Sequence, residues 1–125
     1  MARKEISAKD AAAIGPYSHG VDADGLIFLS GQTPIDPKTG KLVEGDIQAQ
    51  TEQVFKNLSK VLEAAGLTFD NVQKCNVFLT DMKNFQAMNE VYKKQFTKPF
   101  PARTTIGVAA LPMNAQVEIE MIAKR

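Results

Sequence analysis

Cysteine and histidine are nearly absent from this sequence, which holds one residue of each, Cys75 and His19. A single cysteine cannot form a disulfide within the chain, and one cysteine with one histidine falls short of a zinc-ligand set. No serine, cysteine or aspartate stands at an informative spacing from His19, so no Ser–His or Cys–His pair for nucleophilic catalysis is visible. We therefore expect no metal ion and no nucleophilic triad.

Long apolar runs and an excess of charge of one sign are also lacking. No stretch approaches the roughly 20 apolar residues that span a bilayer, and no apolar segment follows the charged start of the chain. Fifteen Lys and Arg balance fourteen Asp and Glu, for a net charge of +1. Because nucleic-acid affinity depends largely on neutralising phosphates, the composition gives no argument for binding nucleic acid. We expect a cytoplasmic protein that does not associate with membranes.

The composition that remains is that of an ordinary globular domain. Of the 125 residues, 44% are hydrophobic and 23% are charged. This size and balance fit one domain with a core of useful size, and they argue against disorder.

Hydrophobic periodicity predicts an α+β fold with the element order βββαβαββ. The clearest helix covers residues 47–65, where apolar side chains recur every three or four residues, with Asp46 as its N-cap and Gly66 at its end. A second helix is expected over residues 85–96. Strands are expected near residues 5–7 and over 17–21, 26–29, 72–79, 104–110 and 117–122, with a loop over 34–45 and a turn over 112–115.

Several of the predicted strands are apolar on both faces, namely at residues 26–29, 77–79 and 106–111. Two helices can cover only one face of the resulting mixed sheet. A lone copy would therefore expose a large apolar patch on the second face. We expect this face to pack against other copies of the chain in a homo-oligomer.

The last two strands carry residue types that suit a small carboxylate-bearing molecule. Arg103 and Thr105 share one strand face, and Glu118 and Glu120 share another, because side chains alternate along a strand. A short turn joins the two strands, so Arg103 is expected to be able to meet a glutamate. A guanidinium grips a carboxylate ligand with two hydrogen bonds. The alternative is a solvated ion pair between Arg103 and one of the glutamates.

Three further positions could line a pocket or serve the fold alone. Tyr17 follows a proline that fixes the direction of its ring. Gly31, within residues 30–32, would let a ligand approach the backbone, and Asn89 is a weak helix former inside a predicted helix. The structural alternatives are a packing anchor for Tyr17, a bend or bulge at Gly31, and a bond from Asn89 to a loop.

Four short segments of the chain carry a family resemblance. They are Ile14-Gly15-Pro16-Tyr17-Ser18, Leu29-Ser30-Gly31-Gln32, Pro99-Phe100-Pro101-Ala102-Arg103-Thr104 and Val117-Glu118-Ile119-Glu120. In this order they resemble the RidA (YjgF-type) family of reactive-intermediate deaminases, also labelled the endoribonuclease L-PSP or translation-initiation-inhibitor family. The resemblance runs from about Ser7 to the end of the chain, and four motifs in register make it specific.

The resemblance implies one RidA-like domain over residues 1–125 with the chorismate-mutase-like (YjgF) fold, a mixed sheet with two helices on one face. It also implies a homotrimer with active sites between subunits. The implied activity is hydrolysis of 2-iminopropanoate and 2-iminobutanoate, or their enamine tautomers, to 2-keto acids and ammonia. Pyridoxal-phosphate enzymes release these intermediates, and the family itself uses no metal or organic cofactor.

Three residues would carry the catalysis that the resemblance implies. Arg103 matches the arginine that clamps the substrate carboxylate, and Glu118 matches the residue that orients or activates water. Tyr17 matches the tyrosine at the imine end of the pocket.

Four more residues would complete substrate binding. Ser30 and Gly31 match pocket-lining positions, and Asn89 matches a helix asparagine near the site. Thr105 stands where many relatives have cysteine, which argues against a covalent thiol route in this chain. Two alternative functions stay open: an endoribonuclease or translation inhibitor, and a non-catalytic protein that binds small metabolites.

Overall fold

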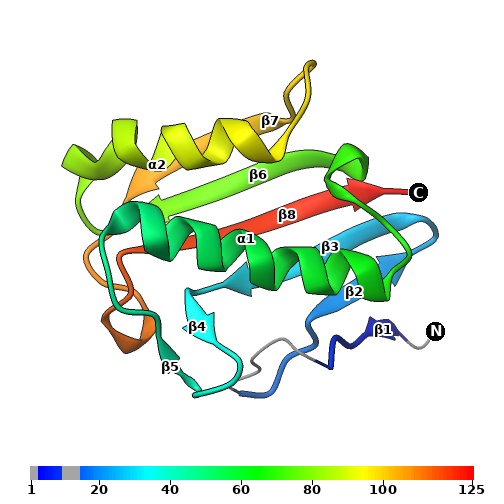
Figure 1. Ribbon diagram of the computed structural model, residues 1–125. Helices are drawn as coiled ribbons and strands as arrows, with labels where there is room; N and C mark the ends of the chain where they lie inside the picture. Colours follow the sequence, from blue (N-terminus) through cyan, green and yellow to red (C-terminus); the bar gives the residue numbers. More distant parts are fainter. Residues whose placement is uncertain (1–2, 10–14) are drawn as a thin grey trace.

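The computed structural model describes residues 3–9 and 15–125, which form a six-stranded mixed sheet with two helices across one face (Figure 1). The strand order is β1-β2-β3-β8-β6-β7. α1 (Ile47–Ala64) crosses the middle of the sheet, and α2 (Phe85–Tyr92) covers the edge formed by β6 and β7. The strands of this sheet are β1 (Lys4–Ile6), β2 (Gly20–Ala23), β3 (Leu26–Gln32), β6 (Val72–Leu79), β7 (Ala102–Gly107) and β8 (Val117–Lys124).

The α1 helix forms where the apolar periodicity predicts it. The Asp46 carboxylate accepts a hydrogen bond from the backbone N–H of Ala49 at 2.9 Å, which satisfies a donor without a partner inside the helix. Gly66 follows the helix with a φ of +76°, a left-handed conformation that favours glycine. Val54 and Leu58 are fully buried in the stripe that faces the sheet. Each such side chain stabilises the fold by about 1.5–3 kcal/mol relative to exposure.

The central strands β6 and β8 separate a core face from an open face by simple alternation. Val77 and Ile119 are register partners on these antiparallel strands, and both are completely buried beneath the helices. The neighbouring partners Phe78 and Glu118 point to the uncovered side. After β6, the chain crosses through α2 and returns as β7, parallel to β6.

The strand predicted over residues 17–21 starts later than expected. It begins at Gly20, which pairs with both β1 and β3. Upstream, Gly15 has a φ of +122° and its carbonyl accepts the backbone N–H of Tyr17 at 3.0 Å, so the chain turns before it reaches the sheet. Tyr17 is therefore outside the strand, with 45% of its surface exposed. Ile14, the first residue of the recognised motif, lies outside the described residues.

Three other predicted boundaries also need correction. The strand predicted over residues 104–110 is β7, which ends earlier because its partner strand β6 ends there. The loop predicted over residues 34–45 contains a small hairpin of β4 (Ile35–Asp36) and β5 (Lys41–Leu42). The helix predicted over residues 85–96 is α2 followed by one turn of 3₁₀ helix.

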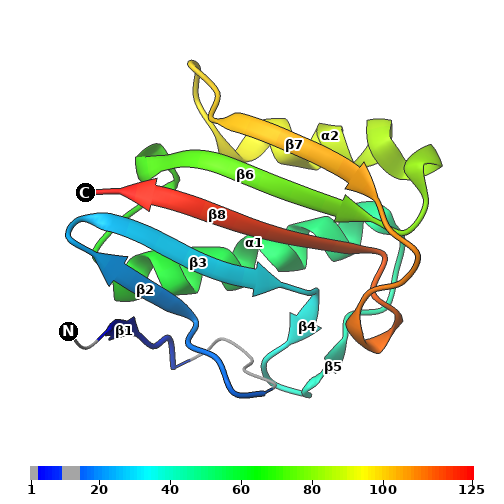
Figure 2. The same cartoon turned by 180° about the vertical axis from the view of Figure 1, so that it is seen from behind.

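The face of the sheet away from the helices carries exposed apolar side chains, as predicted. Figure 2 shows this face with no helix in front of it. Leu26, Phe28 and Ile106 project from it with 38%, 44% and 45% of their surfaces exposed. Since removing apolar surface from water is favourable by roughly 25 cal/mol per Å², this face favours contact with another apolar surface.

Candidate active site

A cavity of about 490 Å³ opens where β3 ends and β8 begins. This volume is in the range of small-molecule sites. The predicted site residues Tyr17, Ser30, Gly31 and Glu118 line it, together with the segment that follows β3. The structure therefore brings four of the seven predicted residues together at one end of the sheet.

Gly31 leaves the space that the Glu118 side chain occupies. The pairing of β3 with β8 shifts in register between Leu29 and Gln32, so Ser30 and Gly31 form a bulge. A Cβ atom on Gly31 would overlap Glu118 Oε2 and lie 3.0 Å from Glu118 Cδ. The bulge expected at Gly31 is present, and the group that approaches its backbone is the Glu118 side chain.

Ser30 joins the cavity to the segment that carries Tyr17. Its Oγ donates to the carbonyl of Ser18 at 2.7 Å, and its backbone N–H donates to the carbonyl of His19 at 2.9 Å. The buried His19 in turn accepts the backbone N–H of Ala8 on Nδ1 at 2.9 Å. The N-terminal arm, the turn before β2 and the end of β3 are therefore linked, and His19 has a structural role.

Glu118 is a partly buried carboxylate in the lining of this cavity. Partial burial, and then the charge of the neighbouring Glu120, raise the pKa of the Glu118 carboxyl above that of an ordinary glutamate. Both side chains lie on the open face of β8, which explains their repulsion. A higher pKa makes the ionised carboxylate a stronger proton acceptor.

Arg103 lies on β7 beside α2, where its guanidinium is held in one orientation. Its Nη1 donates to Asn89 Oδ1 at 2.7 Å. Its Cζ atom lies 4.6 Å from the ring centre of Tyr92 and 5.5 Å from that of Phe85. These contacts with aromatic rings suit a planar guanidinium.

The aromatic partners of Arg103 were not among the predicted site residues. Phe85, Asn89 and Tyr92 stand at positions i, i+4 and i+7 of α2 and therefore share one helix face. Aromatic residues at this spacing are typical of the buried face of a helix. An asparagine between two aromatic residues on that face was the available signal for a cation-binding surface.

Thr105 lies two residues beyond Arg103 on the same face of β7. Its buried Oγ1 has no hydrogen-bond partner among the described residues. Because an unpaired buried polar group is unfavourable by about 1–3 kcal/mol, this hydroxyl favours a polar ligand beside Arg103.

Cys75 does not supply a reactive thiol in place of the cysteine expected at the position of Thr105. It is the register partner of Arg103 on β6, and it is completely buried. Burial raises the pKa of the Cys75 thiol to about 11. The thiol is therefore protonated at neutral pH, as expected of a small core residue.

Arg103 and Glu118 do not meet within one chain, so the expectation that the final turn joins them is wrong. Strand β6 lies between β7 and β8, and the connection between those two strands passes around its end (Figure 2). Arg103 pairs in register with Cys75 on the helix side, whereas Glu118 pairs with Phe78 on the open side. The predicted residues thus form two half-sites. The arginine half-site comprises Arg103, Asn89 and Thr105, and the glutamate half-site comprises Tyr17, Ser30, Gly31 and Glu118.

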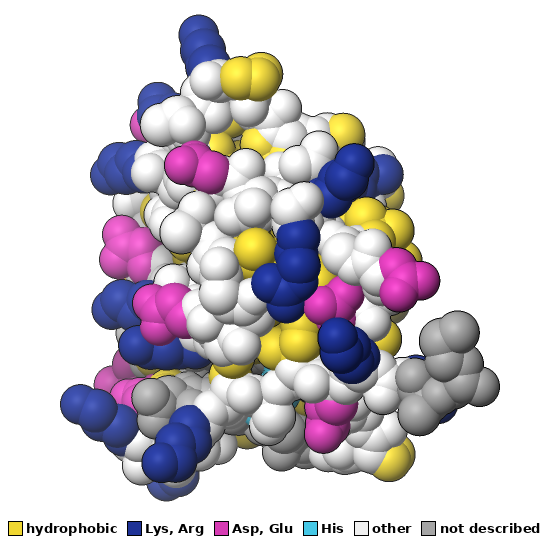
Figure 3. All heavy atoms as spheres, turned by 90° about the vertical axis from the view of Figure 1, so that its right-hand side faces the viewer, with side chains coloured by type: hydrophobic (Ala, Val, Ile, Leu, Met, Phe, Trp, Pro, Cys, Tyr) yellow, Lys and Arg dark blue, Asp and Glu magenta, His cyan; other side chains and the backbone are white. Residues whose placement is uncertain are grey.

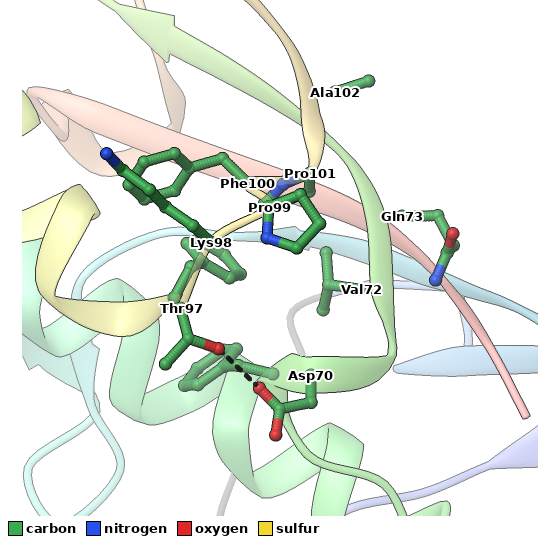
Figure 4. Close-up of a pocket in the computed structure, with 11 residues that line it drawn as sticks. Asp70, Val72, Gln73, Thr97, Lys98, Pro99, Phe100, Pro101 and Ala102 are labelled. Carbon is green, nitrogen blue, oxygen red and sulfur yellow. Dashed lines mark hydrogen bonds between the residues drawn. The ribbon is translucent and has the colours of Figure 1, made fainter.

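A second cavity, of about 350 Å³, lies at the opposite end of the strands (Figure 4). It is bounded by the start of β6 and by the connection from α2 to β7, with Pro99, Phe100 and Pro101 along one side. Its single carboxylate, Asp70, accepts a hydrogen bond from the Thr97 hydroxyl at 3.4 Å. Because this lining contains no predicted site residue, the two half-sites remain the candidate active site.

The described residues contain no cluster of three or more His, Cys, Asp or Glu side chains that could hold a metal ion. Within the same residues, no helix combines the length and apolar character needed to cross a membrane. On the face in Figure 3, basic and acidic side chains are interspersed, without a patch of one sign.

Comparisons with known proteins place this geometry in a family. A family model described as Endoribonuclease L-PSP matches residues 7–125. The chain is 52% identical to protein DfrA of Myxococcus xanthus, over 98% of this chain and 96% of that protein. It is 49% identical to the 2-iminobutanoate/2-iminopropanoate deaminase of Mus musculus, over 97% and 90% of the two chains. The crystal structure of RidA from an Antarctic Psychrobacter is 44% identical and superposes with a TM-score of 0.94, covering 98% and 100% of the chains.

The fold and the two half-sites define an α+β protein with an oriented arginine and a partly buried glutamate on opposite sides of one sheet. By the family match and by these relatives, the chain belongs to the RidA (YjgF-type) family of reactive-intermediate deaminases. The predicted family and the predicted fold are both confirmed.

Proposed function

We propose that this protein hydrolyses 2-iminopropanoate and 2-iminobutanoate, and their enamine tautomers, to 2-keto acids and ammonia. It acts as a homotrimer in which the arginine half-site of one subunit faces the glutamate half-site of the next. The observation that carries the proposal is the placement of Arg103 and Glu118 on opposite faces of one sheet. Relatives named as deaminases of these two imines support the choice of substrate.

The complementary positions of the half-sites support a closed ring of copies, and the family resemblance supplies the number three. A ring of identical chains joined head to tail brings two different surfaces of the chain together at every contact. In such a ring, the arginine edge of one copy meets the glutamate face of the next. The same contact buries exposed apolar side chains such as Phe28 and Ile106. One arrangement therefore covers the exposed apolar side chains of the open face and brings the two half-sites together.

Arg103 binds the substrate carboxylate. Its guanidinium is already held by Asn89 and stacked on Tyr92, so little side-chain freedom is lost when the ligand binds. A charge-assisted hydrogen bond of this kind is worth about 1.5–3 kcal/mol. The unpaired hydroxyl of Thr105 supplies an additional donor beside it.

Glu118 activates the water that attacks the C=N carbon. The enamine tautomer first takes a proton on its β-carbon and becomes the iminium, the protonated form of the imine. The Glu118 carboxylate accepts a proton from the attacking water, and the new C–O bond gives a carbinolamine. Glu118 returns that proton to the amine, the C–N bond breaks as the C=O bond forms, and the hydroxyl proton passes to Glu118 as ammonia leaves. Positioned acid–base catalysis of this type contributes about 10²–10⁴-fold.

Tyr17 and Ser30 complete the imine end of the site from the cavity wall. No covalent intermediate is needed, which agrees with Thr105 in place of cysteine and with the protonated thiol of Cys75. Imines hydrolyse readily in water, so a site with one base and one carboxylate clamp is sufficient.

The test is release of keto acid and ammonia from freshly generated 2-aminoacrylate. The wild type should exceed the buffer rate, and Arg103→Ala should lower kcat/KM by about 10–100-fold, the equivalent of its lost charge-assisted bonds. Glu118→Gln should lower kcat, whereas Glu120→Gln, the matched control on the same strand face, should retain it. Circular dichroism and sedimentation of each variant check that it is folded and assembled. If the wild type does not exceed the buffer rate, the deaminase proposal fails for this substrate class.

A further inference from the structure

Two buried amide side chains on α1 hydrogen-bond to backbone groups near the cavity. Gln50 and Asn57 are only 6% and 1% exposed, and they lie two helical turns apart on the buried stripe. An amphipathic helix normally places apolar side chains at such positions. A buried amide is unfavourable unless its hydrogen bonds are made, so its partners indicate what it is for.

Asn57 holds the segment that follows β3. Its Nδ2 donates to the carbonyl oxygens of Thr33 at 3.1 Å and Ile35 at 2.9 Å. Its Oδ1 accepts a hydrogen bond from Gln53 Nε2 at 2.9 Å, which fixes the orientation of the amide. Thr33 and Ile35 both line the cavity of the glutamate half-site. Asn57 therefore sets one wall of that cavity.

Gln50 holds the start of β8 in a similar way. Its Oε1 accepts the backbone N–H of Gln116 at 2.9 Å. The carbonyl of Gln116 accepts the backbone N–H of Thr80 at 3.2 Å, so this residue is held from both sides. Glu118 follows only two residues later. This contact, together with the pairing of Val117 and Glu118 with β6, holds the backbone where β8 begins.

We infer that Gln50 and Asn57 are positioning residues for the candidate active site, with Gln50 orienting Glu118 and Asn57 holding the wall formed by Thr33 and Ile35. The inference rests on the proposed deaminase function. Neither side chain reaches the cavity, so each acts through the backbone that it binds. Because they act on different walls, Gln50 governs turnover and Asn57 governs substrate affinity.

The kinetic test uses variants that separate hydrogen bonding from packing. Gln50→Met removes the acceptor at similar size, and it should lower kcat about tenfold with little change in KM, since small displacements of a catalytic group are costly. Gln50→Glu keeps an oxygen acceptor for the Gln116 N–H and should retain more of the wild-type kcat. Asn57→Leu removes both donors and should raise KM about tenfold with a smaller effect on kcat.

A packing control shows whether a loss of core packing alone can change kcat and KM. Val54 is fully buried on the same stripe and carries no polar group. Val54→Ala should lower the unfolding temperature to a comparable extent while kcat and KM stay at wild-type values. If Val54→Ala reproduces the kinetic changes, the loss reflects general loosening and the inference is overturned. If folded Asn57→Leu keeps the wild-type KM, the role of Asn57 is overturned.

A second readout requires no turnover. The ¹³C carboxyl signal of Glu118 is titrated by NMR in the wild type and in each variant. In Gln50→Met the pKa of Glu118 should move toward the ordinary glutamate value, because a displaced carboxylate gains water, whereas Val54→Ala should leave it unchanged. Gln50→Leu replaces Gln50→Met if the latter does not fold. An identical Glu118 titration in wild type and variant overturns the role of Gln50. A shifted titration in a protein without deaminase activity upholds that role and refutes the proposed function.

Discussion

A methyl group at position 31 tests whether Glu118 has to lie where the structure places it. A Cβ on Gly31 would overlap Glu118 Oε2 and lie 3.0 Å from Cδ and 3.2 Å from Cγ. Carbon atoms in contact prefer about 3.5–4.0 Å, so the Glu118 side chain must retreat by roughly 0.5–1 Å. Because a misplacement of about 1 Å can cost 100-fold in rate, Gly31→Ala should lower kcat/KM by about 10–100-fold.

The fold should tolerate the same substitution, because the atoms that must move belong to a flexible side chain. We expect urea denaturation to show a loss of no more than about 1–2 kcal/mol in the free energy of unfolding. The matched control repeats Gly31→Ala in a Glu118→Ala background, where the added methyl has space and should have little further effect. Wild-type kcat/KM in Gly31→Ala, or an equal stability loss in both backgrounds, would refute the reasoning.

Three further outcomes concern the base, the oligomer and the arginine clamp. Glu118 acts in its ionised form and its pKa is raised, so kcat/KM should rise with pH along an acid limb above the ordinary glutamate pKa of about 4.3. Glu120→Gln removes a repelling charge and should move that limb to lower pH in the same pH profile. Phe28→Asp places a charge on the open apolar face and should give monomers in sedimentation velocity, whereas an intact oligomer would contradict the proposed contact. Asn89→Ala frees one side of Arg103 and should raise KM about tenfold, and an unchanged KM would show that stacking alone orients the guanidinium.

Elements with a strong local signal could be predicted from the sequence. The α1 helix follows its apolar stripe and its Asp46 cap, and β6 covers residues 72–79 as predicted. The apolar second face of the sheet could also be foreseen, because side chains in strands alternate regardless of which strands pair. The strand predicted over 17–21 starts too early because the turn at Gly15 does not interrupt the apolar pattern.

The pairing of strands could not be predicted from the same signal. Adjacent strands in sequence often pair, and this tendency placed Arg103 next to Glu118. In the structure, β6 lies between their strands because β7 pairs parallel to β6 at the edge. The candidate residues could be chosen by type and motif, while their grouping depended on contacts between distant parts of the chain. Gln50 and Asn57 could not be predicted for the same reason. Their hydrogen-bond partners lie 66 residues away for Gln50, and 22 and 24 residues away for Asn57.

The central claim is that one site uses Arg103 from one subunit and Glu118 from another, and mixing subunits tests it most directly. Arg103→Ala and Glu118→Gln chains are each assayed alone, then unfolded together, refolded in equal amounts and assayed again. In a closed ring with sites between neighbours, random mixing should restore about a quarter of the wild-type sites. A mixture of wild type with the double variant, refolded in the same way, gives the reference for assembly. Activity near that fraction supports the shared site, and a mixture no more active than its separate components would contradict it.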